Sequence, residues 1–296
     1  MITIGIPFYN PGKYFKESIQ SILLQSYTDF ELILLDDGST DDSLKIAHSF
    51  QDKRIKIVSD GLNLGLPARL NQIIDMASGK YIARMDADDL VSTERLAKQV
   101  EFLDHNIDID LVSTGICSIT YDSEIIAYRL PSAEKSSNLT VNEGILGTTG
   151  IAHATIMARR DWCIRNRYDE KIKLIEDYQL WLEASFKGDL KVGFIKEALY
   201  FYREESSIEY KKVMRAYKTK LKINLERYKA TASKLTIPKL YFYLYLKLAI
   251  CFLLNKFGLL KKLIPLRNRG NKQSSKTYSY IVGEIKKIQN FKHLSI

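Results

Sequence analysis

The sequence is poor in cysteine, and its few cysteines form no recognisable pattern. Cys117, Cys163 and Cys251 are far apart in a chain of 296 residues, and none belongs to a Cys-x-x-Cys pair. This excludes small disulfide scaffolds and the usual zinc sites, which need more cysteines at closer spacing. No charged segment followed by an apolar core precedes the strand-like Ile2–Ile6, so no secretory signal is expected. A reducing, cytoplasmic compartment is the simplest expectation.

Long apolar runs are also lacking. The apolar stretch Leu240–Leu254 has only 15 residues and carries Lys247 in its middle. A helix that spans a bilayer needs roughly 20 consecutive apolar residues. The sequence therefore predicts no transmembrane helix from this stretch.

Glycine-rich phosphate loops are missing as well. The segment after the first expected strand reads PFYNPG at residues 7–12, and neither G-x-G-x-x-G nor G-x-x-x-x-G-K-[ST] occurs in the chain. Dinucleotide-binding and P-loop proteins hold their phosphates with such loops. A phosphate-bearing ligand of this chain must therefore be held in another way.

The composition is otherwise that of a folded protein, with 46% hydrophobic and 27% charged residues. The formal net charge of +9 hides a division along the chain. Residues 1–208 hold 23 Lys and Arg against 32 Asp and Glu, whereas residues 209–296 hold 21 against 3. Such an asymmetry indicates two regions with different partners. We expect one domain over residues 1–207 and a basic, aromatic-rich helical region over residues 208–296.

Strand-like and helix-like segments alternate through the first 115 residues. Apolar runs predict strands, and apolar residues three or four positions apart predict helices. The expected strands are 3–6, 30–35, 54–59, 81–85 and 110–114, and the expected helices are 14–25, 42–50, 66–77 and 93–106, the last capped by Thr93. This alternation predicts an α/β fold with a mostly parallel sheet and helices on both faces.

The later part of the chain is less regular. Residues 132–142 are polar and predict a loop, and 154–158 and 199–203 predict short strands. Residues 177–187 and 208–228 predict helices, and Pro238 opens a further, very aromatic helix. No internal repeat is present.

Carboxylates gather where two of the expected strands end. Asp36 and Asp37 follow one strand, and Asp86, Asp88 and Asp89 follow another. The carboxyl ends of parallel strands meet at one edge of a sheet, where α/β proteins bind ligands. Crowded carboxylates repel one another unless a cation lies among them, and oxygen ligands favour Mg²⁺ or Mn²⁺. The sequence predicts a metal site beside a phosphate-bearing ligand, although a turn with a helix cap is an alternative for Asp36 and Asp37.

A second acidic pair, Glu176 and Asp177, opens an expected helix. Acids at this position stabilise a helix by capping it and by complementing its dipole. A carboxylate near an active cleft can also serve as a general base. The residues alone leave both interpretations open.

Taken in order, these motifs resemble glycosyltransferase family 2. The resemblance rests on TIGIPFYN at 3–10, QSYTDFEL at 25–32, DDGSTD at 36–41, NLG at 63–65, RLN at 69–71, DADD at 86–89 and EDYQLW at 176–181. It covers about residues 1–205, and it implies the GT-A (Rossmann-like) fold and an inverting transfer from a nucleotide-sugar donor. The chain lacks the Q-x-x-R-W of processive members, which favours the addition of a single sugar.

The resemblance also implies roles for single residues. Asp177 matches the catalytic base, and Asp37 matches the acid that contacts the nucleobase, usually uracil. Asp86 and Asp88 match the D-x-D positions for ribose and metal, and we expect Asp88 and Asp89 to hold Mn²⁺ or Mg²⁺. The residues expected to line the rest of the pocket are Pro7, Tyr9, Arg69 and Arg203 on the donor side, and His153 and Glu176 on the acceptor side.

The implied reaction moves one hexose from a UDP-sugar to a hydroxyl of a glycan or lipid-linked acceptor, as in bacterial surface-polysaccharide synthesis. A metal-stabilised diphosphate leaves as the anomeric carbon is inverted. One alternative is a sugar-1-phosphate nucleotidyltransferase, which would need a glycine-rich N-terminal loop that is lacking. The other is a catalytically silent scaffold, against which the intact acids argue.

The basic C-terminal region carries its own expectation. Lys239, Lys256, Lys261 and Lys262 flank the apolar stretch, a pattern typical of a helix that lies on an anionic membrane surface. A homodimer interface or a cap on the catalytic domain is the alternative. Nucleic acid is not expected, because no recognised nucleic-acid-binding module is present. We expect the protein at the inner face of the cell membrane.

Overall fold

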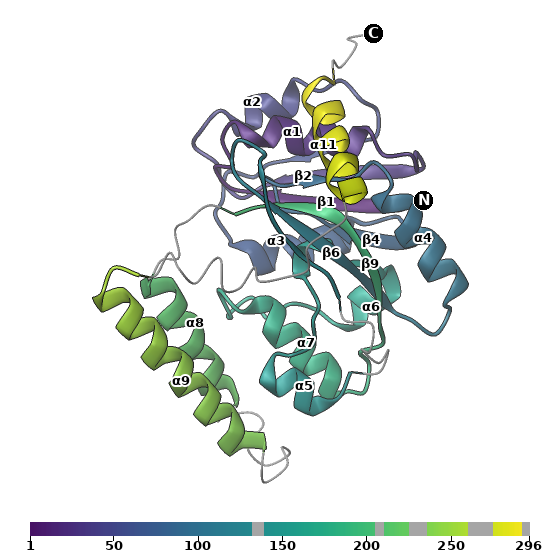
Figure 1. Cartoon of the computed structure of the whole chain (residues 1–296). Coiled ribbons are helices and arrows are strands. Elements are labelled where there is room, and N and C mark those ends of the chain that lie inside the picture. The colour runs from purple at the N-terminus through teal and green to yellow at the C-terminus, as the bar shows by residue number, and fades with distance from the viewer. Residues whose placement is uncertain (132–138, 205–209, 225–235, 260–274, 292–296) are drawn as a thin grey trace.

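The structure is a computed structural model that describes residues 1–131, 139–204, 210–224, 236–259 and 275–291. Within these residues a nine-stranded sheet has the order β3-β2-β1-β4-β8-β6-β9-β5, with β7 paired to β6 (Figure 1). Its strands are β1 (Ile2–Phe8), β2 (Phe30–Asp36), β3 (Ile55–Val58), β4 (Tyr81–Arg84), β5 (Leu90–Val91), β6 (Leu111–Ile119), β7 (Ile125–Arg129), β8 (Met157–Arg159) and β9 (Val192–Arg203).

Most of the described strands run in one direction. β1, β2, β3 and β4 pair in parallel, and β6 and β9 continue in the same direction. β8 is inserted antiparallel between β4 and β6, while β7 and β5 run antiparallel at the far side. The predicted α/β fold with a mostly parallel sheet and flanking helices is confirmed.

Helices cover both faces of the sheet because the central strands are apolar on both sides. On β1, Ile2, Ile4 and Ile6 pack in the core that α1 and α4 cover, whereas Ile33 and Leu35 of β2 pack on the α3 face. The helices are α1 (Tyr14–Leu23), α2 (Ser43–His48), α3 (Leu66–Met76), α4 (Arg95–His105), α5 (Val141–Leu146), α6 (Arg160–Arg165), α7 (Glu176–Phe186), α8 (Tyr210–Ile223), α9 (Thr236–Lys256) and α11 (Ser275–Gln289).

The strand order reverses at β1 and β4, and in open α/β sheets the ligand crevice lies at the carboxyl ends of such strands. The chain runs outward from β1 to β2 and β3, and then returns to add β4 on the other side of β1. Such a reversal of strand order is where open α/β sheets bind ligands. The loops that follow β1, β2 and β4 therefore border one binding edge.

Several expected elements differ from those observed. Thr93 does not cap α4, because its hydroxyl and its backbone N–H both donate to Glu284 of α11, at 2.8 and 2.6 Å. Residues 154–158 are not one strand but a 3₁₀ turn (His153–Thr155) followed by β8. Part of the expected loop 132–142 is helical, since α5 begins at Val141 behind a Thr140 capping box, and residues 132–138 lie outside the described residues.

The basic region packs against the rest of the protein at two separate places. α8 and α9 lie side by side next to α5 and α7 (Figure 1). α11 returns to the sheet, where Ile281, Ile285 and Ile288 join a core with Leu90 and Phe201. The domain boundary expected near residue 207 stays a prediction. Residues 208, 209 and 225–228 of the expected basic helix lie outside the described part of the chain.

The cysteines and the longest apolar stretch of the sequence both lie in described parts of the structure. Cys117, Cys163 and Cys251 are all buried and free. In the described part of the chain, no helix combines the length and apolar character needed to cross a membrane.

Candidate active site

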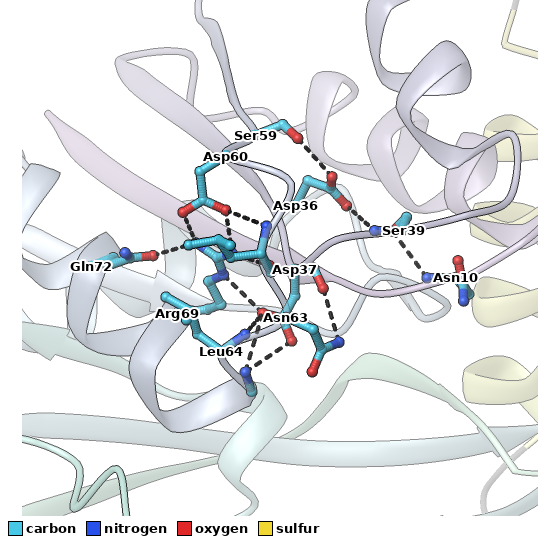
Figure 2. A network of polar contacts seen from close by, with 12 residues as sticks. Asn10, Asp36, Asp37, Ser39, Ser59, Asp60, Asn63, Leu64, Arg69 and Gln72 are labelled. Carbon is cyan, nitrogen blue, oxygen red and sulfur yellow. Dashed lines mark hydrogen bonds and ion pairs between the residues drawn. The ribbon is translucent and has the colours of Figure 1, made fainter.

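Asp37 lies at the carboxyl end of β2 in the centre of a polar network (Figure 2). Its Oδ1 accepts hydrogen bonds from the backbone N–H groups of Leu64 and Gly65, at 2.7 and 3.1 Å, and from Nε of Arg69 at 2.9 Å. Asp37 is buried, so these donors compensate a charge that would otherwise be costly to desolvate. The network fixes the loop after β3 against the end of β2.

Arg69 connects Asp37 to a further acid that the sequence interpretation did not include. The guanidinium of Arg69 is 1% exposed and donates to both carboxylate oxygens of Asp60, at 2.7 and 2.8 Å (Figure 2). These hydrogen bonds hold the pKa of Asp60 well below its usual range. Asp60 follows β3 as Asp37 follows β2, so its position at a third strand end was the signal available in the sequence.

Gly38 allows the loops after β2 and β3 to meet. Its φ is +77°, in the left-handed region that favours glycine, and a Cβ would lie 3.1 Å from the carbonyl of Leu62. Beside it, Asp36 does not face the crevice as an open acid, because it accepts hydrogen bonds from the Ser39 N–H at 2.9 Å and the Ser59 hydroxyl at 2.8 Å. The turn interpretation therefore holds for Asp36.

The loop after β1 closes the same edge. Pro7 lies near the end of β1 opposite Leu35, and the side chain of Tyr9 is exposed beyond it. The side-chain oxygen of Asn10 accepts hydrogen bonds from the backbone N–H groups of Thr40 and Asp41, at 2.7 and 3.2 Å. Pro7, Tyr9 and Asp37 thus border one edge of the sheet.

The acidic segment after β4 is held by two arginines and a tyrosine. Arg84, the last residue of β4, donates to the two carboxylate oxygens of Asp86 at 2.6 and 3.3 Å. Asp89 is buried and accepts hydrogen bonds from the hydroxyl of Tyr200 and the backbone N–H of Arg203, both at 2.7 Å. Asp89 therefore braces the segment against β9.

Burial and neighbouring negative charge raise the pKa of two carboxylates in this segment. Burial, followed by the negative charge of Asp86, raises the pKa of Asp88. Burial and the charges of Asp88 and Asp86 also raise the pKa of Asp89 well above its usual value. A cation among these oxygens would relieve both the repulsion and the desolvation cost.

Oxygen donors of this kind suit Mg²⁺ or Mn²⁺, which commonly take one or two carboxylates and complete their shell with substrate phosphates. Among the residues that the structure describes, no three His, Cys, Asp or Glu side chains are grouped so as to hold a metal ion by themselves. The donor set fits a metal that is shared with a diphosphate. Metal binding by Asp88 and Asp89 stays a prediction, and the half-buried Asp88 lies between the two braced acids.

Arg203 contacts the protein with most of its guanidinium. The side chain donates to the backbone carbonyl of Asp88 at 2.5 Å and to Glu17, and it lies over the ring of Tyr14. Arg203 thus supports the acidic segment from behind, together with its backbone bond to Asp89. Its expected contact with diphosphate oxygens stays a prediction.

Glu176 and Asp177 lie in the first turn of α7, where their charges complement the helix dipole, but neither of them is the N-cap residue. The N-cap is Ile175, and α7 has no side-chain cap hydrogen bond. Asp177 instead accepts from the adjacent Tyr178 N–H at 2.7 Å, and the preceding Leu174 has a φ of +75°, which is strained for a branched side chain. Strain of this kind is concentrated at functional sites.

The charge of Arg84 acts on both acidic groups. Burial raises the pKa of both Asp177 and Glu176, and the positive charge of Arg84 partly opposes that rise at each of them. The same charge also partly opposes the rise in the pKa of Asp88. Arg84 was missed in the sequence interpretation, although an arginine at the end of an otherwise apolar strand run was visible.

The charge of Arg84 also acts on His153. Its Nε2 is 2.7 Å from the hydroxyl of Tyr168, and its ring packs edge-on against Trp181. Burial, followed by the charge of Arg84, holds the pKa of His153 well below its usual value, so the ring is neutral at pH 7. Trp181 is 3% exposed and belongs to the core.

The fold is that of an α/β protein with acids at the carboxyl ends of its parallel strands. The profile described as Glycosyl transferase family 2 matches residues 3–165. A curated relative, an uncharacterised glycosyltransferase of Methanocaldococcus jannaschii, is 30% identical over 285 residues, which cover 93% of this chain and 97% of the relative. The chain therefore belongs to glycosyltransferase family 2, and it is a glycosyltransferase.

Solved structures share the fold. TarS residues 1–349 of S. aureus in complex with UDP-GlcNAc aligns with a TM-score of 0.61 at 17% identity, covering 97% of this chain and 81% of that one. The mannosyltransferase PcManGT of Pyrobaculum calidifontis, in complex with GDP-Man and Mn²⁺, aligns with a TM-score of 0.59 at 16% identity, covering 98% and 87%. These neighbours confirm the GT-A fold expected from the sequence.

Proposed function

We propose that this enzyme transfers one hexose from a UDP-sugar to an acceptor hydroxyl with inversion at the anomeric carbon. The observation that carries the proposal is that Arg84, which donates to Asp86 at 2.6 Å, also acts electrostatically on Asp88, Glu176 and Asp177. A shared cation supports a site in which the acids assigned to the donor and the acid assigned to the acceptor work together. Asp37 extends the same edge toward the nucleotide end.

The donor side has three parts. We assign Asp37 and its partner Arg69 to the nucleobase, Pro7 and Tyr9 to the border of its pocket, and Asp86 to the ribose. Asp88, with Asp89 behind it, would hold a divalent metal ion, and Arg203 would steady the segment and the diphosphate. When bound, this metal neutralises charge on the departing diphosphate. The UDP-GlcNAc and Mn²⁺ of the two structural neighbours support this assignment.

The acceptor side is built on α7. Asp177 would accept the proton of the acceptor hydroxyl as that oxygen attacks the anomeric carbon from the face opposite the leaving group. Its raised pKa suits a base, and Glu176 and His153 would line the acceptor path. We infer a glycan or lipid-linked acceptor of surface-polysaccharide synthesis, which would place the enzyme at the cytoplasmic face of the membrane.

Nucleotide binding is the first test. We expect UDP to raise the melting temperature of the full chain in the presence of Mn²⁺, and EDTA to remove most of that shift. A ligand at 100 times its Kd stabilises a protein by about 2.7 kcal/mol, which is several degrees for a chain of this size. Differential scanning fluorimetry with UDP, GDP and CDP measures the preference.

Turnover completes this test. A panel of UDP-sugars should be hydrolysed slowly with release of UDP, and this release should stop in EDTA. Release of pyrophosphate from a sugar 1-phosphate and UTP would instead support a nucleotidyltransferase. Tight UDP binding without any turnover, across donors and acceptors, would support a silent scaffold.

A further inference from the structure

Helix α9 has two opposite apolar faces, of which one is used for packing. Leu240, Leu244 and Cys251 are at most 5% exposed. Leu240 and Leu244 pack in a core with residues of α5, α7 and α8. Through this face, α9 packs against the rest of the enzyme.

The opposite face of α9 is exposed. Phe242, Leu246 and Leu253 follow the i, i+4, i+11 spacing of one helical stripe, and they are 71%, 46% and 51% exposed. Of the eighteen large hydrophobic side chains exposed in the described part of the chain, nine lie between residues 242 and 259. Contiguous apolar patches of this kind mark interaction surfaces.

A basic stripe lies on the neighbouring helix. Lys211, Arg215, Lys218 and Lys222 of α8 are exposed and follow the i, i+4, i+7, i+11 spacing of one helical face. Neither α8 nor α9 contains an Asp or a Glu. The two helices therefore combine exposed apolar side chains with several positive charges and no acid of their own.

We propose that the exposed face of α9 and the basic stripe of α8 together bind the surface of an anionic lipid bilayer. A bilayer satisfies both features, because its acyl boundary accepts apolar side chains while its anionic headgroups attract lysine and arginine. A second copy of this chain would satisfy only the apolar feature, since two basic helix pairs repel each other. Lys261 and Lys262, which were expected to contribute, lie outside the described residues.

The bilayer-binding pair is joined directly to the candidate base helix. Asn224, just after α8, donates to the hydroxyl of Tyr178 at 2.6 Å, and Lys220 lies 3.8 Å over the ring of Tyr178. Tyr178 is the residue next to Asp177. If the acceptor is lipid-linked, as proposed above, binding through α8 and α9 would hold α7 near the surface that carries it.

Flotation of the full chain with vesicles tests the inference without donor or acceptor. We expect the protein to float with vesicles of phosphatidylcholine and phosphatidylglycerol, and far less with phosphatidylcholine alone. The variant Phe242→Ser, Leu246→Ser, Leu253→Ser should lose at least about tenfold in partitioning, because each side chain contributes apolar burial. The variant Lys211→Gln, Arg215→Gln, Lys218→Gln should lose the preference for anionic vesicles.

A matched control separates this surface from exposed apolar side chains in general. Ile107, Ile126 and Ile164 are 80%, 41% and 45% exposed on the catalytic domain, and their replacement by Ser should leave flotation unchanged. Absence of flotation with anionic vesicles would overturn the inference. So would a dimer, seen by light scattering, that the Phe242, Leu246 and Leu253 variant dissociates. UDP binding measured on the same samples shows separately whether the proposed function stands.

Discussion

Asp177→Asn should remove most sugar transfer and leave donor binding nearly intact. Asn cannot accept a proton from the acceptor hydroxyl, and base catalysis typically contributes about 10²–10⁴-fold. The substitution keeps the size of the side chain, and Asp177 makes its hydrogen bond to the Tyr178 N–H through one oxygen, which the Asn carbonyl can replace. Initial rates with saturating donor and acceptor, beside UDP titration by calorimetry, measure the two effects separately.

Asp161 offers the matched control for this variant. It is an exposed acid in the first turn of α6, so Asp161→Asn makes the same chemical change at a helix start outside the site. Its turnover should equal that of the wild type. In the wild type, the rate should fall as the pH drops through the raised pKa of Asp177, above the usual Asp range, because only the ionised form accepts a proton. Wild-type turnover by Asp177→Asn would exclude Asp177 as the base.

Arg84→Met should lower kcat/KM by about a hundredfold, a loss comparable to that from misplacing a reacting group by about 1 Å. Arg84 is buried and positions Asp86 through two hydrogen bonds, while its charge acts on Asp88, Glu176 and Asp177. Without this cation, the pKa of Asp177 rises further, so the acid limb of the pH profile should move to higher pH. Because Asp86 is 31% exposed, we expect a stability loss of about 1–3 kcal/mol, less than for a fully buried pair.

Two further variants separate positioning by Arg84 from mere support of the fold. Arg84→Lys keeps the positive charge but loses the planar guanidinium that makes two hydrogen bonds. Its acid limb should therefore lie at the wild-type pH, while its kcat/KM should be only partly recovered relative to Arg84→Met. Arg54→Met removes a similar ion pair, Arg54 with Asp52 at 2.8 Å, which lies before β3 and away from the crevice. It should leave both kcat/KM and the pH profile unchanged. An unshifted acid limb in Arg84→Met would show that Arg84 supports the fold only.

The binding edge was predictable from the sequence because it depends on local patterns and one topological rule. Apolar runs placed the strands, and the common edge of parallel strands brought Asp37 and the Asp86–Asp89 segment to one side of the sheet. The position of α7 beside that edge required the family resemblance. No local pattern states that the sheet curls through the antiparallel β8, whose three residues are too short to give a period-2 signal.

The features that sequence reasoning missed depend on contacts between distant residues. Arg84 could be seen at the end of a strand, but its electrostatic neighbours Tyr200 and Tyr168 come from distant parts of the sequence. Thr93 was expected to cap α4, but it donates instead to Glu284, which lies 191 positions further along the sequence. Such pairings follow from how α11 returns to the sheet, which periodicity within each helix does not specify.

The anomeric configuration of the product tests the central claim most directly. In the proposed reaction one base lies on the acceptor side and a metal-stabilised diphosphate on the donor side, which allows a single displacement. With an α-linked UDP-sugar and an accepted hydroxyl, proton NMR of the first product should show a β-glycoside. An α-glycoside would contradict single displacement and, with it, the assignment of Asp177 as the base.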